Sequence, residues 1–299
     1  MNNYNKNCFT GLNNLGNTCF FNSILQLLIQ CTILNKLLLL NTFDGDLILY
    51  YKEFINLYNN NTNYSFSPNN IVNYVSNKLN RIGYSQDDAD QYLNYIIDTL
   101  LSETKDYLEK NNLGKTIIHK NYSLNKIIDN LFTIKIKKNI ICPKCNYISE
   151  SDDNINNLYL SLNNRSEISE LIDEYLQEEY LDEENKYKCD KCSKYVNAKI
   201  ERKINILPKY LIITLKRYNN LNQKINKHVN MEEEIILYSK KYSLRGIVYH
   251  SGSTGGGHYV YYGKKSRWCV YNDNSVNDIT ENDLNFIKSI GYIYLYVCI

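Results

Sequence analysis

Cys19 follows a stretch rich in glycine and asparagine, GLNNLGNT, and begins an apolar segment. Apolar residues recur at three- and four-residue spacings over 19–31, which predicts an amphipathic helix with Thr18 as its cap and Cys19 in its first turn. A helix N-terminus stabilises a thiolate and lowers its pKa, and nearby asparagine amides can donate to an oxyanion. The stretch therefore contains every part of a nucleophile site except the base.

The chain has four histidines from which that base can come. His258 follows three glycines and precedes an alternating segment, HYVYYGK, so its backbone is fixed and one side of its ring is uncluttered. His250 flanks the same glycine-rich loop and is the rival candidate. His119 and His228 have no such setting, and we expect them to be ordinary surface or core residues.

Asn272 and Asp273 end the segment WCVYND and are the two candidates to orient the imidazole. Neighbouring side chains on a strand point to opposite faces, so only one of the pair can face the ring if the strand continues through both. An amide oxygen can accept an Nδ1–H bond and fix the tautomer, which makes Asn272 competent for this role.

Two CxxC pairs form a second chemical pattern. They are Cys142-Pro-Lys-Cys145 and Cys189-Asp-Lys-Cys192. Four thiolates from two such turns give the tetrahedral site that structural zinc prefers. The alternatives are two disulfides or unliganded thiols. A nucleic-acid role is disfavoured because the net charge is only +2 and no strip of basic and aromatic residues accompanies the pairs.

Composition is that of an ordinary globular protein, with 43% hydrophobic and 22% charged residues in 299. That length is sufficient for one large domain or two ordinary ones. The N-terminal stretch MNNYNKNCFTGLNN has no apolar core of a signal peptide, and the longest apolar run, 37–40, is too short to cross a bilayer. We expect an intracellular location, cytoplasmic or nuclear, where cysteines are mostly reduced.

The order of patterns along the chain predicts an α+β fold. Up to about residue 115 the chain is expected to be mainly helical, with a second helix over 85–103, a Ser85–Asp88 capping box and a loop over 56–70. An acidic helical segment is expected over 166–184. Alternating segments predict strands of a mostly antiparallel sheet, over 131–142, 210–218, 244–250, 258–264, 268–272 and 291–299.

Taken together, these motifs resemble the ubiquitin-specific proteases, a family of papain-like cysteine deubiquitinases. The similarity extends nearly from end to end: GLNNLGNTCFFNSILQLL, SQDDADQYLNYIIDTL, the second CxxC with the strand that follows, YSLRGIVYHSGSTGGGHYVYY, WCVYNDNSV and GYIYLYVCI. The resemblance implies a single catalytic domain over 1–299 shaped as a hand. It has a helical thumb near 1–115, zinc-tipped fingers inserted at about 130–215, and an antiparallel palm from the remaining strands.

The resemblance also implies roles for individual residues. Cys19 would attack the carbonyl of the C-terminal glycine of ubiquitin, His258 would act as base and then acid, and Asn272 would orient His258. Asn14 would complete the oxyanion hole, with Asp273 assisting that region. The ubiquitin tail would contact Asp88, Gly256, Gly257 and Tyr259.

The implied cofactor is one structural zinc held by Cys142, Cys145, Cys189 and Cys192, with no cofactor for catalysis. The implied partners are ubiquitin and ubiquitinated proteins. The protein is expected to be a monomer and to bind neither nucleic acid nor a membrane. Two alternatives stay open: a catalytically dead ubiquitin-binding scaffold, and a protease for another ubiquitin-like modifier. Residues 87, 90 and 91 depart from the Gln and Glu usual in the family's second motif.

Overall fold

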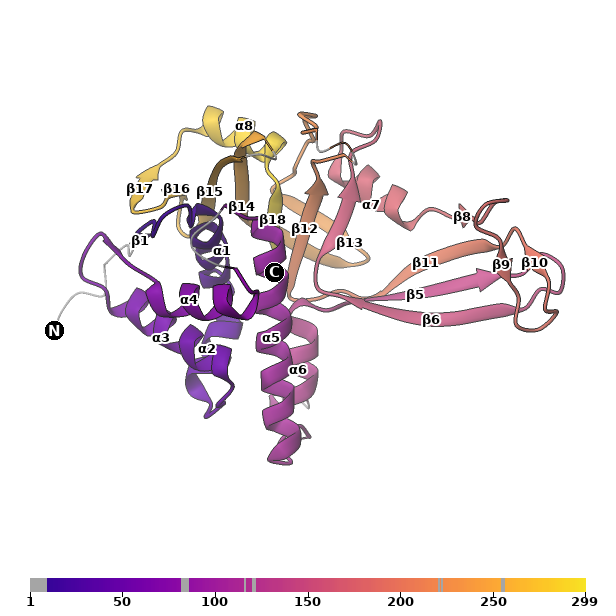
Figure 1. Ribbon diagram of the computed structural model, residues 1–299, viewed down its shortest axis with the longest axis horizontal. Coiled ribbons are helices and arrows are strands. Elements are labelled where there is room, and N and C mark those ends of the chain that lie inside the picture. Colours follow the sequence, from indigo (N-terminus) through magenta and orange to yellow (C-terminus); the bar gives the residue numbers. More distant parts are fainter. Residues whose placement is uncertain are drawn as a thin grey trace.

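The computed structural model describes residues 10–81, 86–115, 117–119, 122–219, 221, 223–253 and 256–299. Residues 10–132 are mainly helical and form the indigo-to-magenta part of Figure 1, so the helical region predicted up to about residue 115 extends through α6. The helices are α1 (Cys19–Ile29), α2 (Thr32–Leu40), α3 (Asp46–Asn60), α4 (Asn69–Lys78), α5 (Ala89–Lys110) and α6 (Leu124–Phe132). Two short pairs join strands β1 (Gly11–Leu12) with β2 (Ser65–Phe66) and β3 (Ile117–His119) with β4 (Tyr122–Ser123).

Helix α5 matches its predicted apolar stripe. Its buried residues include Ala89, Tyr92, Leu93, Ile96, Ile97, Leu100 and Leu101. Asp88 is the N-cap and accepts a hydrogen bond from the N–H of Asp90 at 2.9 Å. The predicted capping box placed Asp88 inside the helix and is therefore wrong about its position, and its partner Ser85 lies outside the described residues.

Two other local predictions are corrected. The expected loop over 56–70 is shorter, because α3 continues to Asn60 with Tyr58 buried on its inner face. Thr18 occupies the N-cap of α1 but makes no capping hydrogen bond with its side chain. Its hydroxyl instead accepts from the N–H of Leu15 at 2.9 Å, which folds the preceding turn back onto the helix.

The central sheet carries the second half of the site. Its order is β17-β16-β15-β14-β18-β12-β7, with β13 also paired to β14, and every pair is antiparallel except β12 with β7. The strands are β7 (Leu158–Ser161), β12 (Tyr210–Lys216), β13 (Glu234–Leu237), β14 (Lys240–Ser253), β15 (Gly256–Lys264), β16 (Trp268–Asn272), β17 (Ser275–Asp278) and β18 (Ile293–Cys298).

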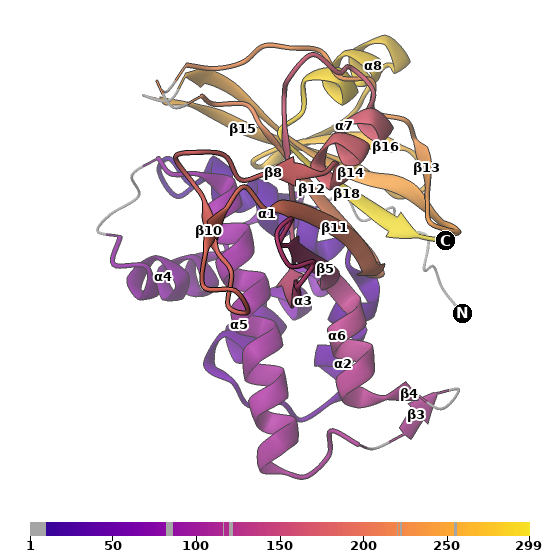
Figure 2. The ribbon, with the colours of Figure 1, turned by 90° about the vertical axis from the view of Figure 1, so that its right-hand side faces the viewer.

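Both faces of this sheet are covered at its centre, which explains why β12 and β18 are buried over most of their length. Along β18, Ile293 and Leu295 face the core shared with the helices of residues 10–132, whereas Tyr294 and Tyr296 face the opposite core. Helices α7 (Ile168–Leu176) and α8 (Glu281–Ile290) cover that second face. Figure 2 shows α5 and α6 running side by side below the sheet.

A narrow second sheet projects from the body toward the right of Figure 1. Its order is β6-β5-β11-β8, from β5 (Ile134–Ile141), β6 (Ile148–Ile155), β8 (Glu179–Tyr180) and β11 (Lys199–Ile206), and a hairpin of β9 (Tyr187–Lys188) and β10 (Tyr195–Val196) lies at its tip. We call this projection, residues 134–155 and 179–206, the fingers. The strand predicted over 131–142 begins only at Ile134 because α6 includes Phe132, and the helix predicted over 166–184 is limited to α7.

The arrangement of helices, central sheet and projecting fingers confirms the predicted α+β class and fits the papain-like hand. Among the described residues no single helix is long and apolar enough to cross a membrane, although α1 and α2, bent by 81° at their junction, pass that test of length and composition as a pair.

Candidate active site and cysteine cluster

Cys19 lies at the first position of α1, where the helix packs against β15. Its side chain is 3% exposed, and its sulfur accepts the N–H of Tyr259 at 3.5 Å. Burial raises the pKa of the Cys19 thiol, the Tyr259 N–H opposes that effect, and the charge of Asp273 adds to it. The direction is opposite to the one expected from a helix N-terminus alone, so a nucleophilic thiolate needs a base to take the proton.

His258 and Asn272 are brought together from adjacent strands. His258 lies on β15, Asn272 is the last residue of β16, and the imidazole Nε2 lies 2.6 Å from the Asn272 Oδ1. The expectation that Nδ1 makes this bond is wrong. Because the amide oxygen can only accept, Nε2 carries the proton in this pair and Nδ1 is left as the basic nitrogen.

Asp273 turns away from the imidazole because the strand ends before it. Its φ of 50° lies in the left-handed region, and its carboxylate accepts from the Nδ2 of Asn14 at 2.9 Å and of Asn22 at 2.8 Å. The Oδ1 of Asn14 in turn accepts the N–H of Gly16 and of Thr18, each at 3.0 Å. These bonds fix the Asn14 amide, and its second N–H makes no hydrogen bond to another described residue.

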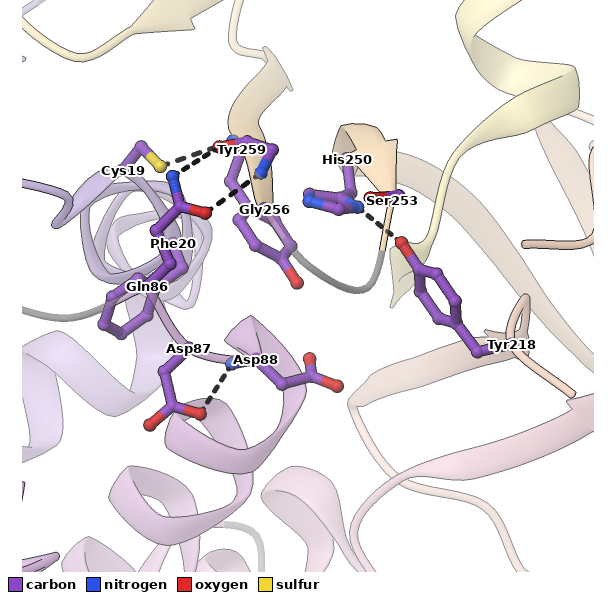
Figure 3. Close-up of a pocket in the computed structure, with 11 residues that line it drawn as sticks. Cys19, Phe20, Gln86, Asp87, Asp88, Tyr218, His250, Ser253, Gly256 and Tyr259 are labelled. Atoms are coloured by element: carbon purple, nitrogen blue, oxygen red, sulfur yellow. Dashed lines mark hydrogen bonds between the residues drawn. The ribbon is translucent and has the colours of Figure 1, made fainter. Parts of the chain in front are cut away.

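A pocket of about 380 Å³ opens beside the thiol (Figure 3). The residues predicted to bind substrate all line it: Asp88, Gly256, Gly257 and Tyr259. Asp88 accepts a hydrogen bond from the Tyr292 hydroxyl at 3.0 Å. A side chain at Gly257 would lie 2.1 Å from the carbonyl oxygen of Ser251, so only glycine fits at this wall.

His250, the rival base, lines the same pocket without joining the pair formed by His258. Its Nδ1 lies 2.5 Å from the hydroxyl of Tyr218, and its ring packs at 4.3 Å from that of Tyr259. Burial, together with the charge of Lys224, lowers the pKa of His250 to about 4. The ring is therefore neutral at physiological pH. The remaining histidines are elsewhere: His228 is an exposed residue bonded to Ser289, and the side chain of His119 lies outside the described residues.

The segment that carries Tyr218 is held by a buried cation. Arg217 is 2% exposed and donates to the carbonyl oxygens of Gly291, Lys227 and Ser289 at 2.6, 2.7 and 3.1 Å. Because a buried guanidinium must satisfy its donors, these bonds anchor the start of the 217–229 segment beside the pocket. Tyr218 and Gln86 also line the pocket and were not predicted to do so. Tyr218 ends a predicted strand, and Gln86 stands in a motif of which only Asp88 was expected to contact the substrate.

The four CxxC cysteines form a cluster at the tip of the fingers. Their sulfurs lie within 4.8 Å of one another, with 3.9 Å between Cys142 and Cys192 and 3.6 Å between Cys145 and Cys189. All four are free thiols, which excludes the two-disulfide alternative. Sulfurs placed tetrahedrally about 2.3 Å from a zinc ion would lie roughly 3.8 Å apart, so the cluster fits a metal ion of that size.

The two turns of the cluster share one geometry. In each, the first cysteine accepts a hydrogen bond at its carbonyl from the residue after the second cysteine: Asn146 at 2.9 Å and Ser193 at 2.8 Å. Both of those residues have positive φ, 52° and 55°. The turns are thus two matching knuckles that present their thiols toward a common centre.

The fold and the pocket together define the class of protein: a papain-like hydrolase with a cysteine at the start of its central helix. The sequence matches the family model described as ubiquitin carboxyl-terminal hydrolase over residues 10–296. The chain belongs to the ubiquitin carboxyl-terminal hydrolase family, a family of cysteine-type deubiquitinases.

Curated relatives come from animals and plants. The chain is 29% identical to ubiquitin carboxyl-terminal hydrolase Usp2 of Drosophila melanogaster over 96% of its own length and 34% of the relative. It is 29% identical to ubiquitin carboxyl-terminal hydrolase 25 of Arabidopsis thaliana over 89% of its own length and 44% of the relative. It is 26% identical to human ubiquitin carboxyl-terminal hydrolase 2 over 99% of its own length and 56% of the relative. The chain thus spans between a third and somewhat over half of the length of these relatives.

Proposed function

We propose that this protein is a deubiquitinase that uses Cys19 to hydrolyse the isopeptide or peptide bond after the C-terminal glycine of ubiquitin. The observation that carries the proposal is the meeting of three distant segments. The sulfur of Cys19, on α1, accepts the N–H of Tyr259 on β15, and the neighbouring residue on that strand, His258, pairs with Asn272 at the end of β16. Membership of the ubiquitin carboxyl-terminal hydrolase family supports ubiquitin as the substrate.

In the proposed acylation step, Nδ1 of His258 takes the Cys19 proton while the sulfur attacks the glycine carbonyl carbon. The imidazolium then returns that proton to the departing lysine amine, and a thioester joins ubiquitin to Cys19. Water, deprotonated by the same imidazole, hydrolyses the thioester and restores the thiol. Asn272 keeps Nε2 protonated, so Nδ1 stays available in each half-reaction.

We propose that the oxyanion formed in both steps is held by two donors. One is the backbone N–H of Cys19, which belongs to the first turn of α1, and the other is the second Nδ2 proton of Asn14. Asp273 aligns this amide through its 2.9 Å bond and is a positioning residue in this scheme. A donor fixed in advance stabilises the developing charge without reorganisation at the moment of reaction.

The narrow pocket supports a tail without side chains next to the reacting carbonyl. Gly256, Gly257, Tyr259 and Asp88 all line this pocket. In this proposal a glycine pair fits the channel, and the carboxylate of Asp88 interacts with a basic residue further up the tail.

The protein is proposed to act inside the cell, in the cytoplasm or the nucleus. The described cysteines are free thiols, as expected in a reducing compartment.

We further propose that zinc is the ion held by Cys142, Cys145, Cys189 and Cys192. The knuckle geometry, the all-sulfur donor set and the sulfur spacing support zinc over harder cations. The ion would be structural, because four protein ligands leave no open position for a substrate. Strands β9 and β10, which flank Cys189 and Cys192, lie at the far end of the fingers from helix α1, which begins at Cys19.

Cleavage of a panel of substrates tests the proposed activity. Purified protein is incubated with ubiquitin carrying a C-terminal aminocoumarin, with di-ubiquitins of each linkage, and with the corresponding fusions of other ubiquitin-like modifiers. Release from ubiquitin substrates, lost in Cys19→Ala, supports the proposal. Ubiquitin binding without any cleavage would favour the scaffold alternative, and cleavage of another modifier alone would favour the second alternative.

A further inference from the structure

Among the described residues, no strand pairs with one edge of β15 where it passes the thiol. On one side, β14 pairs with β15 from Gly263 down to Gly256. On the other side, β16 pairs with it only over Tyr261–Lys264. Main-chain groups of alternate residues point to the same edge of a strand, so Tyr259 and Gly257 continue the edge at which Tyr261 meets β16.

Two side chains take the place of the missing strand there (Figure 3). The sulfur of Cys19 accepts the N–H of Tyr259 at 3.5 Å. The carboxamide of Gln86 bonds to both main-chain groups of Gly257: its Oε1 accepts the N–H at 3.0 Å, and its Nε2 donates to the carbonyl at 3.0 Å. A carboxamide offers the same donor and acceptor as a peptide unit, so Gln86 completes the pairing that a neighbouring strand would otherwise provide.

We propose that Gln86 is a stand-in for the main chain of the substrate, and that an incoming tail must displace it from Gly257. An extended peptide that joins a strand edge does so through main-chain hydrogen bonds. Residues two apart on a strand are separated by about 6.6 Å. A substrate tail whose terminal carbonyl reaches Cys19 at the level of Tyr259 therefore passes Gly257 with the residues just before that carbonyl. Those residues compete with Gln86 for the N–H and the carbonyl of Gly257.

This inference rests on the proposed function and adds a step of regulation at that site. Gly257 offers only main-chain groups at this wall, because any side chain there would strike the backbone of β14. Gln86 is exposed, so its two bonds can break in favour of water at small cost. The apparent affinity for a tail is then the intrinsic affinity multiplied by the fraction of molecules in which Gly257 is free.

Substitution Gln86→Met keeps the length of the side chain and removes both hydrogen bonds. In the unsubstituted chain Gln86 is bonded to Gly257 in most molecules under this inference. Removing those bonds should therefore lower KM for ubiquitin–aminocoumarin by about 3- to 10-fold while kcat stays within about 2-fold. The matched control is Asn60→Ala, which removes an exposed carboxamide on α3 that bonds only to the carbonyl of Asn56, and its kinetics should equal those of the unsubstituted chain. An unchanged or raised KM in Gln86→Met would overturn the inference, and a raised KM would mean that Gln86 holds the tail.

A spectroscopic measurement separates this inference from the proposed function. In isotope-labelled Cys19→Ala protein, the side-chain amide signals of Gln86 and the backbone N–H signal of Gly257 are followed while ubiquitin is added. Saturable shifts of both are expected, with faster exchange of the Gln86 amide protons with solvent once the bond to the Gly257 carbonyl is lost. Ubiquitin that binds without moving either signal contradicts the stand-in role alone. A protein that neither binds nor cleaves ubiquitin contradicts the proposed function and this inference together.

Discussion

The two cysteine sites of this molecule are built in opposite ways. Cys19 is one thiol in a large core, and its partners come from strands more than two hundred residues away along the chain. The cluster at the tip of the fingers holds four thiols in two short turns. Among the described residues its buried core is Cys142, Cys189, Val196 and Ala198, with a few partly buried side chains packed against it. The packing of the whole domain positions the first site, whereas the second has little besides its sulfurs to order it.

This contrast predicts that the two sites fail differently. Loss of the Cys19 sulfur should abolish catalysis without unfolding the protein, because the helix and sheet around it stay packed. Loss of one sulfur in the cluster removes order from the fingers, because a metal bound by the folded form contributes folding free energy.

Cys19→Ala should lower kcat on ubiquitin–aminocoumarin by at least about 10⁴-fold, since no other group can form the acyl intermediate. Ubiquitin binding by calorimetry and the melting temperature should stay near those of the unsubstituted chain. Cys298→Ser, a partly buried thiol outside both sites, is the matched control and should keep full activity. Turnover close to normal in Cys19→Ala would remove this thiol from the mechanism.

Asn272→Ala should lower kcat by about 10- to 1000-fold, because the imidazole loses the acceptor that holds Nε2–H at 2.6 Å. Asn272→Asp should retain most activity and shift the acidic limb of the pH–rate profile. Asp273→Ala should act through Asn14 and lower kcat without altering that limb. If Asn272→Ala is nearly silent while Asp273→Ala is folded and inactive, the two roles are exchanged.

The unsubstituted chain should bind one zinc ion, and Cys145→Ser and Cys192→Ser should each bind less than one. Both variants should melt roughly 5–10 °C lower, as expected when a structural metal is lost. Because the fingers lie apart from Cys19, kcat should change less than KM for ubiquitin. Elemental analysis and thermal melting check this, with Cys298→Ser again as the control. Reduced protein that contains no zinc, or variants that melt unchanged, would contradict the account of the cluster.

A smaller effect is expected from His250, whose pKa falls to about 4 from its usual value near 6.5. Between these two values the unfolded chain binds a proton that the folded chain does not, so the free energy of unfolding rises with pH over this range and falls on acidification. His250→Asn keeps an acceptor for Tyr218 and does not titrate. Its melting temperature should therefore decrease less between pH 6.5 and pH 4.5 than that of the unsubstituted chain. Equal decreases in both proteins would show that His250 does not contribute.

The same contrast explains what the sequence could predict. The CxxC pairs carry their geometry in four-residue turns, so the cluster was predictable from spacing alone. The helix that begins at Cys19 and the apolar stripe of α5 are also local patterns. The helical end of α3 was missed because its asparagines resemble a loop, although Tyr58 packs inward in the tertiary structure.

Long-range contacts were beyond local patterns. The choice of Nε2 over Nδ1 on His258 depends on how β15 lies against β16, which no spacing encodes. The bonds between Gln86 and Gly257 join residues on separate elements, and the raised pKa of Cys19 depends on its burial against β15. The roles of the individual site residues stay predictions that the variants above test.

In the proposed mechanism the Cys19 thiol, activated by His258, attacks the carbonyl at the end of ubiquitin. Ubiquitin carrying a C-terminal propargylamide, which bonds to a nucleophilic thiol in this position, tests it in one measurement. Peptide mapping by mass spectrometry should find a single adduct, on Cys19, that forms much more slowly in His258→Ala and is absent in Cys19→Ala. An adduct on any other cysteine, or bound ubiquitin with no adduct on Cys19, would contradict the account.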